Sequence, residues 1–568
     1  MNRLKDREPY ETITFIRNIL ASFGFFITEA WSDSGVSSLY SVRLEIAGTR
    51  VGTNGKGATK LLALASAYGE FMERLSNGAL FMHLEKDLSR HYGDRLYVPL
   101  LELAKGGRII DTVLEAMEGK KSCQFTLERR LSLFRLWNME KDRDILCFPY
   151  KGLYSKVEEI LPVSFIRHYG SHGMAAGNTV KEAVVQAVSE IVERYCLAKI
   201  YEKGLTPPVI ERTLIFERFP SIRRIIEEIE KGGHFYIEVR DCSLGRGFPA
   251  YCVCLCDKNA HRAAVSFGSS PSIGASLERS FTELLQGRHL GHSATSIPGG
   301  STLPPPFEIR RLFRSSTGNY PLSFWSGTPS WQADRGLLEI SFTDNSHALD
   351  YLSEFFLKQG SEIFVRDVSV FGFPSVHVII PGFSEVMGCS PFFLRYLSTR
   401  KKIGKLFDRL ADCSKEELEL VVEFTDFCRK MSSCDSTPFS RIEAWPNLGP
   451  VENICLFLAS GNAVLEKMSA ASEFCRKAKS QLNGEEADAV SCLADCYDML
   501  SRTSHQDPFA VLEHFYSKSS VALARRIKEM EPKDFIKKIE SRPLHGIDFE
   551  KMFRMAENYT HDMSKELF

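Results

Sequence analysis

Two different rhythms of apolar and polar residues alternate along residues 1 to 400 of the chain. Short runs rich in β-branched and aromatic residues, at 42–46, 234–239 and 376–380, have the character of β-strands. Between such runs, residues 59–77 and 179–203 have the pattern of helices. This mixture predicts an α/β or α+β domain over residues 1–400.

The pattern changes at about Lys401. Strand-like runs vanish, and amphipathic helical runs follow at 415–431, 453–459, 462–481, 485–501, 508–518 and 519–530. Short breaks of Gly, Asn, Ser or Pro separate most of them. Helices joined by short loops predict an all-α domain over residues 401–568, of the kind built from helical repeats, although no strict repeat period is present.

The composition is that of an ordinary globular protein, with 44% hydrophobic and 25% charged residues in a chain of 568. A formal net charge of −1 argues against nucleic acid as a partner, because such proteins usually have a basic surface. We expect neither a secretory signal at the N-terminus nor a membrane span, since no apolar run is long enough. Fifteen scattered cysteines are expected to be reduced thiols, so we expect a cytoplasmic protein.

Two of the predicted helices carry the same signature, a polar residue followed four positions later by Glu-x-x-Glu-Arg. At 100° per residue, the polar residue and both glutamates fall within about 60° of one another on each helix. The flanking positions are mainly apolar, and carboxylates in such surroundings are costly unless cations meet them. The residues concerned are Ser66, Glu70, Glu73 and Arg74 in the first helix and Gln186, Glu190, Glu193 and Arg194 in the second.

Each signature follows a glycine-bearing segment, residues 52–59 and 173–179, that we expect to form a turn. Thr59 and Thr179 are suited to cap the two helices, and Thr179-x-x-Glu182 fits a capping box. Glycines let the backbone approach a ligand, and the free N–H groups at a helix start attract anions. A phosphate chain there, with carboxylates one or two turns inside the helix, predicts a bridging Mg²⁺ ion.

Each of these features has a simpler explanation when it stands alone. A single Glu-x-x-Glu-Arg helix is usually a salt-bridged face, and the first glycine-bearing segment is not a P-loop, because Gly57 follows Lys56. In a third segment, Arg279, Glu283 and Gln286 share a helical face, where an ion pair one turn apart is the simpler explanation. The duplication of the first signature favours two halves of one site.

The three segments together resemble the YcaO family. Its pattern is Ser-x-x-x-Glu-x-x-Glu-Arg, then Gln-x-x-x-Glu-x-x-Glu-Arg, then a helix with Glu-Arg-x-x-x-Glu, and the chain matches each in this order. The flanking residues 54–59, 177–179 and 267–271 also fit, and residues 5–12 resemble the basic opening of the family. The resemblance spans about residues 1–400 and continues into the helical part.

The resemblance implies an enzyme that binds ATP at a Mg²⁺-rich carboxylate site and transfers phosphate to a peptide amide oxygen. A nucleophile then gives an azoline, a thioamide or an amidine. Carried over by motif, the metal ligands would be Glu70, Glu73, Glu190 and Glu193. The nucleotide contacts would be Ser66, Asn178, Gln186, Arg194, Arg279 and Glu283, with Lys5 and Thr12 as further phosphate contacts. Two Mg²⁺ ions would balance the four carboxylates.

The chain departs from the azoline-forming members, many of which end in a Pro-x-Pro-x-Pro tail. Its last residues are Met-Ser-Lys-Glu-Leu-Phe, and its helical part resembles the tetratricopeptide-like region of the stand-alone branch. In that branch the protein assists a radical methylthiotransferase in β-methylthiolation of an aspartate in the twelfth small-subunit ribosomal protein. The resemblance therefore implies a peptide or protein substrate, such a partner, and a homodimer.

Two alternatives stay open. One is a non-catalytic, nucleotide-binding adaptor that recruits a modification enzyme through its helical domain. The other is a cyclodehydratase or thioamide-forming enzyme for a peptide natural product.

Two further groups of residues have weaker signals. Cys252, Cys254 and Cys256 on one face of a strand are expected to be buried structural thiols. His289 and His292, after the third motif, have no acidic partner close in sequence for proton transfer.

Overall fold

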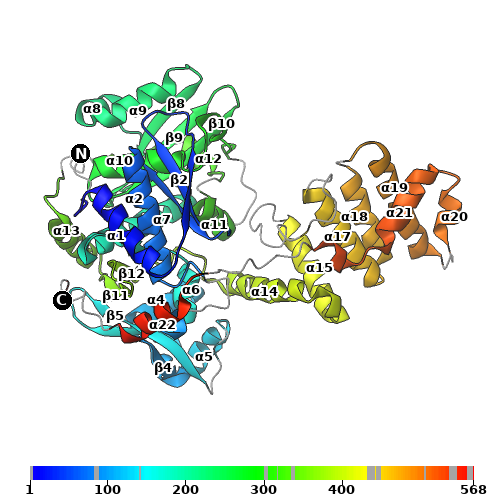
Figure 1. Cartoon of the computed structure of the whole chain (residues 1–568), viewed down its shortest axis with the longest axis horizontal. Coiled ribbons are helices and arrows are strands. Elements are labelled where there is room, and N and C mark those ends of the chain that lie inside the picture. Colours follow the sequence, from blue (N-terminus) through cyan, green and yellow to red (C-terminus); the bar gives the residue numbers. More distant parts are fainter. Residues whose placement is uncertain are drawn as a thin grey trace. The chain divides into compact units, whose positions relative to one another are not determined.

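The structure is a computed structural model that places two compact units along the chain (Figure 1). The first unit comprises Met1–Pro391 together with Arg542–Phe568, and the second comprises Phe392–Ser541. The described residues are 4–81, 88–137, 139, 143–299, 305–315, 318–333, 340–430, 442, 450–480, 482–503, 507–536, 546–559 and 567.

Three antiparallel sheets form the framework of the first unit. In the described residues their orders are β1-β2-β3, then β10-β9-β8, then β4-β5-β11-β12-β7 with β6 paired to β5. The strands are β1 (Ile27–Ser32), β2 (Tyr40–Ile46), β3 (Gly52–Gly57), β4 (Leu96–Pro99), β5 (Asp144–Gly152), β6 (Glu158–Pro162), β7 (Met174–Ala176), β8 (Phe235–Asp241), β9 (Ala250–Asp257), β10 (Arg262–Ser269), β11 (Phe364–Asp367) and β12 (Ser375–Ile379). The three predicted strands coincide with β2, β8 and β12 to within two residues at each end.

Helices cover these sheets, and the unit is therefore a mixed α/β structure, as predicted. The helices are α1 (Pro9–Ser22), α2 (Lys60–Ser76), α3 (Leu100–Leu103), α4 (Arg108–Glu118), α5 (Leu127–Arg135), α6 (Val163–Tyr169), α7 (Val180–Lys203), α8 (Arg212–Arg218), α9 (Pro220–Glu230), α10 (Ile273–Leu284), α11 (Pro305–Ser315), α12 (Leu322–Trp325), α13 (Asn345–Lys358) and α22 (Phe549–Asn558). The first and second predicted helices are α2 and α7, and the third motif lies on α10.

Each of the three motif helices packs on a strand at the end of a different sheet, α2 on β3, α7 on β7 and α10 on β10. Thr59 and Thr179 cap α2 and α7 as predicted, each accepting a hydrogen bond from the backbone N–H three residues later. The last turn of α7 ends at Gly204, which has a φ of 59° and donates its N–H to the helix carbonyls. The three helices thus arise from similar strand–helix units.

Glycines on the strands make this close packing possible. A Cβ on Gly55 of β3 would lie 2.5 Å from the Cβ of Ala67 on α2, and one on Gly268 of β10 would lie 2.8 Å from the N of Ser280 on α10. The expected turn over residues 52–59 is therefore wrong: most of it is strand β3, and Gly55 admits a helix rather than a ligand.

The second unit is helical in its described residues and consists of consecutive helices that contact their neighbours in sequence. These are α14 (Pro391–Asp408), α15 (Lys415–Lys430), α17 (Pro450–Val464), α18 (Met468–Lys479), α19 (Gly484–Arg502), α20 (Pro508–Leu512) and α21 (Lys518–Glu529). The predicted break at residues 460–461 is wrong, because α17 continues to Val464. The tetratricopeptide-like character of this part stays a prediction.

The C-terminal helix α22 belongs to the first unit. The ring of Phe553 stacks on His91 at 4.0 Å, and Phe549 meets Phe81 edge-on at 5.3 Å. The backbone N–H of Asp548 donates to the carbonyl of Phe23 at 3.0 Å. The sequence pattern had grouped these residues with the helices that precede them.

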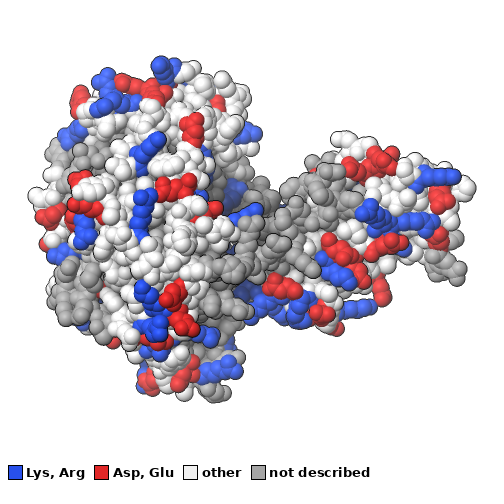
Figure 2. Space-filling view, in the orientation of Figure 1, with Lys and Arg blue, Asp and Glu red and all other residues white. Residues whose placement is uncertain are grey.

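Charged side chains of both signs are interspersed over the face of the molecule in Figure 2, in keeping with the near-zero net charge. Within the part of the chain that the structure describes, every helix is too short or too polar to cross a bilayer.

Replacing Gly55 with alanine should test the close strand–helix packing. We expect Gly55→Ala to destabilise the first unit by about 1–3 kcal/mol, because the new methyl group meets the backbone of α2. Gly69→Ala on the same helix, where a Cβ would have no neighbour within 4 Å, should be neutral or stabilise by up to about 1 kcal/mol. Urea unfolding followed by circular dichroism gives both midpoints, and equal midpoints would contradict this account.

Candidate functional site

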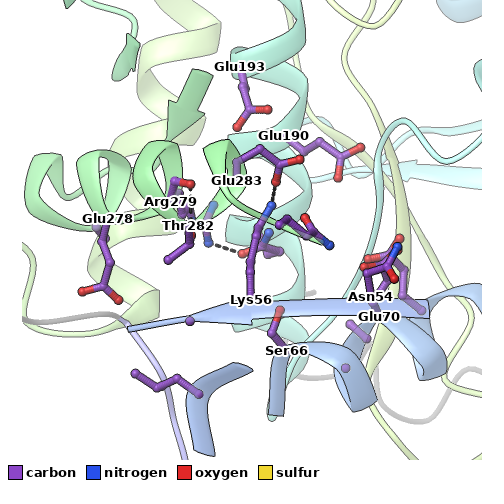
Figure 3. Close-up of a pocket in the computed structure, with 18 of the residues that line it drawn as sticks. Asn54, Lys56, Ser66, Glu70, Glu190, Glu193, Glu278, Arg279, Thr282 and Glu283 are labelled. Atoms are coloured by element: carbon purple, nitrogen blue, oxygen red, sulfur yellow. Dashed lines mark hydrogen bonds and ion pairs between the residues drawn. The ribbon is translucent and has the colours of Figure 1, made fainter. Parts of the chain in front are cut away.

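The three motif helices meet around a cavity of about 690 Å³ in the first unit (Figure 3). Every residue that the sequence predicted for the site lines this cavity. They are Lys5, Thr12, Ser66, Glu70, Glu73, Asn178, Gln186, Glu190, Glu193, Arg194, Arg279 and Glu283. Segments far apart in the sequence therefore form one pocket.

Helix α2 contributes two carboxylates that share one cation. Arg74 lies 3.3 Å from the Oε1 of Glu70 and 3.4 Å from the Oε1 of Glu73. Glu73 is only 9% exposed, and burial raises its pKa well above the ordinary value. The charge of Arg74 lowers this pKa, but by less than burial raises it, and the charge of Glu190 raises it further. One arginine does not fully compensate these two acids.

Helix α7 contributes the second pair of carboxylates. The Oε1 of Glu190 lies 3.0 Å from Arg194, whose guanidinium also lies over the ring of Phe313 at 5.4 Å. Burial raises the pKa of Glu193 to about 7, and the charge of Lys56 is the strongest influence in the opposite direction. The free pocket therefore holds a carboxyl group that is easily protonated near neutral pH.

Two cations cross the cavity from other elements. Lys56 of β3 reaches Glu283 of α10, with which it forms an ion pair, as Figure 3 shows. Arg279 of α10 donates to the side-chain oxygen of Gln186 on α7 and, at 2.8 Å, to the carbonyl of Ser269. Burial lowers the pKa of both Lys56 and Arg279, although nearby glutamates favour their charged forms.

The N-terminal segment forms the remaining wall. Thr12 donates to the Oδ1 of Asn178 at 2.7 Å, and Asn178 in turn donates to Glu182 at 3.0 Å. Lys5 pairs with the same carboxylate at 2.8 Å, and the backbone N–H of Asp6 donates to it at 3.0 Å. Burial would raise the pKa of Glu182, but these contacts, with Lys5 the strongest, lower it below the ordinary value.

Lys56 and Glu182 are pocket residues that the sequence analysis did not assign to the site. Glu182 was interpreted as half of a capping box, but its carboxylate turns away from the backbone of Thr179 toward Lys5. Its partner Lys5 lies 177 positions away in the sequence, so the local sequence pattern around Glu182 could not predict this ion pair. Lys56 lies within residues 54–59, which flank the first motif and match the family. This match was the signal in the sequence that could have assigned Lys56 to the site.

The donor set fits Mg²⁺, although it is not assembled. Among the described residues, no group of three or more His, Cys, Asp or Glu side chains converges closely enough to hold a metal ion. However, the buried Oε1 atoms of Glu73 and Glu190 have only their ion pairs with Arg74 and Arg194 and accept no hydrogen bond from the described residues. Buried carboxylate oxygens of this kind are ligands that a hard divalent cation prefers.

The other candidate residues lie outside the cavity. Cys252 and Cys254 are buried in β9 and Cys256 is half-buried, and burial raises the pKa of all three thiols. His289 accepts a hydrogen bond from the backbone N–H of Gly291 at 3.1 Å, and neither it nor His292 lines the pocket. These positions support the structural explanation for the cysteines.

Comparison with known proteins identifies relatives of this chain. The model of the family described as YcaO cyclodehydratase, ATP- and Mg²⁺-binding, matches residues 54–384. An uncharacterised protein of Haemophilus influenzae is 31% identical over 398 residues, and the ribosomal protein S12 methylthiotransferase accessory factor YcaO of Escherichia coli is 30% identical over 408 residues. These matches cover 67% and 69% of this chain and 66% and 67% of the relatives, so about two thirds of each relative is spanned.

Solved structures that match this chain include a heterocyclase in complex with substrate and cofactor, at 19% identity and a TM-score of 0.49. That match covers 67% of this chain and 52% of the heterocyclase. YcaO from Methanopyrus kandleri, bound with AMPPCP and Mg²⁺, matches at 18% identity with a TM-score of 0.42, covering 67% of this chain and 93% of that protein.

The raised pKa of Glu193 predicts a pH-dependent stability in the absence of ligand and metal. The pKa is about 7 in the folded protein against an ordinary 4.5, so the folded state holds this proton more tightly and loses stability as pH rises from 4.5 to 7. Above pH 7 the loss is complete. We therefore expect Glu193→Gln to match the parent at pH 4.5 and to exceed it by about 1–3 kcal/mol at pH 8.

Denaturant unfolding in EDTA at both pH values provides the measurement. Glu202→Gln, at an exposed position of the same helix, is the matched control and should show no such trend. A stability difference for Glu193→Gln that does not change with pH would refute the assignment of a buried, repelled carboxylate.

Proposed function

The chain belongs to the YcaO family, and on that premise we propose that its pocket binds ATP with Mg²⁺ and activates an amide of a peptide or protein. ATP and Mg²⁺ are the cofactors of this family, as the sequence predicted. The observation that carries the proposal for this chain is the convergence of three distant motifs and the N-terminal segment on one cavity.

The charge of the pocket supports a magnesium nucleotide as ligand. Seven carboxylates and seven cationic side chains line it, so its formal charge is zero. The acids are Glu70, Glu73, Glu182, Glu190, Glu193, Glu278 and Glu283, and the cations are Lys5, Arg7, Lys56, Arg74, Arg194, Arg279 and Arg288. ATP carries about four negative charges, which two Mg²⁺ ions neutralise, so the loaded pocket would stay balanced.

The acidic and the basic side chains of the pocket would have different roles. Glu70, Glu73, Glu190 and Glu193 would hold the metal, which when bound would neutralise charge on the phosphates. Arg194 and Arg279 are suited to phosphate oxygens, because their planar guanidinium groups donate along two parallel directions. The N-terminal residues Lys5 and Thr12, with Asn178, stand ready for further phosphate contacts.

An apolar wall completes the pocket. Leu197, Phe313 and Tyr320 line the same cavity as the charged residues. Apolar side chains beside a few polar groups are typical of sites that hold a flat, weakly polar ring such as adenine. A pocket that offers both apolar and charged side chains suits the two ends of a nucleotide.

Activation would transfer the γ-phosphoryl group to the amide oxygen, so that the bond to ADP breaks and the oxygen becomes a good leaving group. The protein's contribution would be mainly to position the reactants and to stabilise the charge that spreads over the phosphoryl oxygens. Arg194 and Arg279, which line the cavity, would provide this stabilisation, and Gln186, which accepts a hydrogen bond from Arg279, would orient it. The nucleophile that follows is left to the substrate or to a partner.

For the biological substrate, we propose that the chain assists β-methylthiolation of an aspartate in the twelfth small-subunit ribosomal protein. The name of the Escherichia coli relative, 30% identical, supports this role. A radical methylthiotransferase would be the partner. The helices of the second unit would form a tetratricopeptide-like module that docks it. The protein would be a homodimer. The alternative is a non-catalytic adaptor, which the helical second unit favours. A further alternative is a cyclodehydratase for a peptide natural product, after the family's description.

Nucleotide binding can be tested directly. We expect Glu70→Gln and Glu193→Gln to weaken Mg²⁺-dependent ATP binding at least about tenfold, because each removes a negative charge from the metal ligands. Calorimetric titration of ATP with and without Mg²⁺ measures this, and circular dichroism checks the fold. Glu202→Gln should bind ATP with the affinity of the parent. Unchanged ATP affinity in both pocket variants would refute the assignment of Glu70 and Glu193 as metal ligands.

The biological role can be tested by mass spectrometry of the ribosomal protein from cells with and without the gene. We expect the methylthiolated form to fall when the gene is absent and to return when the parent gene is restored. Restoring Glu193→Gln instead separates the alternatives: failure to rescue supports ATP-dependent activation, whereas full rescue supports the adaptor. An unaltered modification in the deletion strain removes this role.

A further inference from the structure

Lys56 stands where the charges of all three motif helices meet. It rises from β3 of the first sheet and forms its ion pair with Glu283 of α10. The charges of Glu193, Glu70 and Glu190, on the two other helices, also stabilise its ammonium group. Figure 3 shows its side chain extending from the strand into the space between these helices.

Three of the four candidate metal ligands have cations of their own. Glu70 and Glu73 share Arg74, and Glu190 pairs with Arg194 one turn along the same helix. These arginines belong to the motif helices, so they move with the acids they neutralise. Lys56 differs because it reaches the acids from outside, on a flexible four-carbon stem.

An ammonium group and Mg²⁺ compete for the same carboxylates. Three of the four candidate metal ligands are drawn into ion pairs with arginines, and the described acids do not gather into a metal-binding group. With Lys56 among them, a divalent cation must enter against a positive charge, and like charges repel each other strongly at a few ångströms in a partly buried site.

We propose that Lys56 is an exchangeable counter-ion of the metal site. In the ligand-free protein its ammonium group neutralises the acids and holds the pocket together. When Mg²⁺ arrives with a nucleotide, Lys56 gives up its place among the carboxylates. The proposal rests on the proposed function of this pocket, and it implies that the residue sets the Mg²⁺ concentration at which the pocket fills.

Substitution of Lys56 in the full-length protein tests this. In Lys56→Met, the Mg²⁺ concentration for half-maximal binding of AMPPCP should fall about tenfold, because the competing charge is gone. In Lys56→Arg, which keeps the charge, it should stay the same or rise. Lys60→Met is the matched control, since Lys60 begins α2 above the ring of Trp31 and does not line the pocket.

A second measurement needs no nucleotide. Without Mg²⁺ the melting temperature of Lys56→Met should lie below that of the parent, and Mg²⁺ alone should raise it more than it raises that of the parent. If the parent binds AMPPCP but Lys56→Met shows an unchanged or raised Mg²⁺ requirement, the counter-ion role is overturned and the nucleotide site stands. If the parent binds no AMPPCP while Mg²⁺ stabilises Lys56→Met selectively, the proposed function falls and the counter-ion role stands. A shift in the same direction for Lys56→Met and Lys56→Arg would mean a packing effect and would also overturn the role.

Discussion

The burial of several carboxylates inside one cavity is the constraint on which the first unit depends. Burial raises the pKa of Glu73 and Glu193, so these acids destabilise the empty pocket unless charge compensates them. Part of the compensation crosses between separate elements, from β3 to α10 through Lys56 and from the N-terminal segment to α7 through Lys5. The charges that line the pocket therefore also connect elements of the first unit that are far apart in the sequence.

The periodic parts of this fold could be predicted from the sequence because their causes are local. The strands β2, β8 and β12 and the caps Thr59 and Thr179 follow from side chains within a few residues of one another. The site residues were predictable for another reason, the match of three motifs to one family. All of them line the cavity.

Glycines and long-range ion pairs were the parts that local patterns could not resolve. Gly55 was interpreted as part of a turn that approaches a ligand, and Gly461 as part of a helix break. In the structure both admit a neighbouring element: Gly55 faces α2, and a Cβ on Gly461 would lie 2.6 Å from Val422 of α15. At both positions a side chain would collide with a neighbouring element, but the sequence alone does not show which element takes the space. Glu182 shows the same limit for charge, since its capping pattern was local and its actual partner, Lys5, was not.

The return of α22 to the first unit has a consequence for the order in which the chain can fold during synthesis. Residues 392–541 are an insertion in a unit whose last helix is made only after them. On the ribosome, the inserted helices can fold as soon as they emerge. The surface around Phe23, Phe81 and His91 stays uncovered until α22 has been synthesised. The nucleotide-binding unit is therefore completed last, although its motifs are synthesised first.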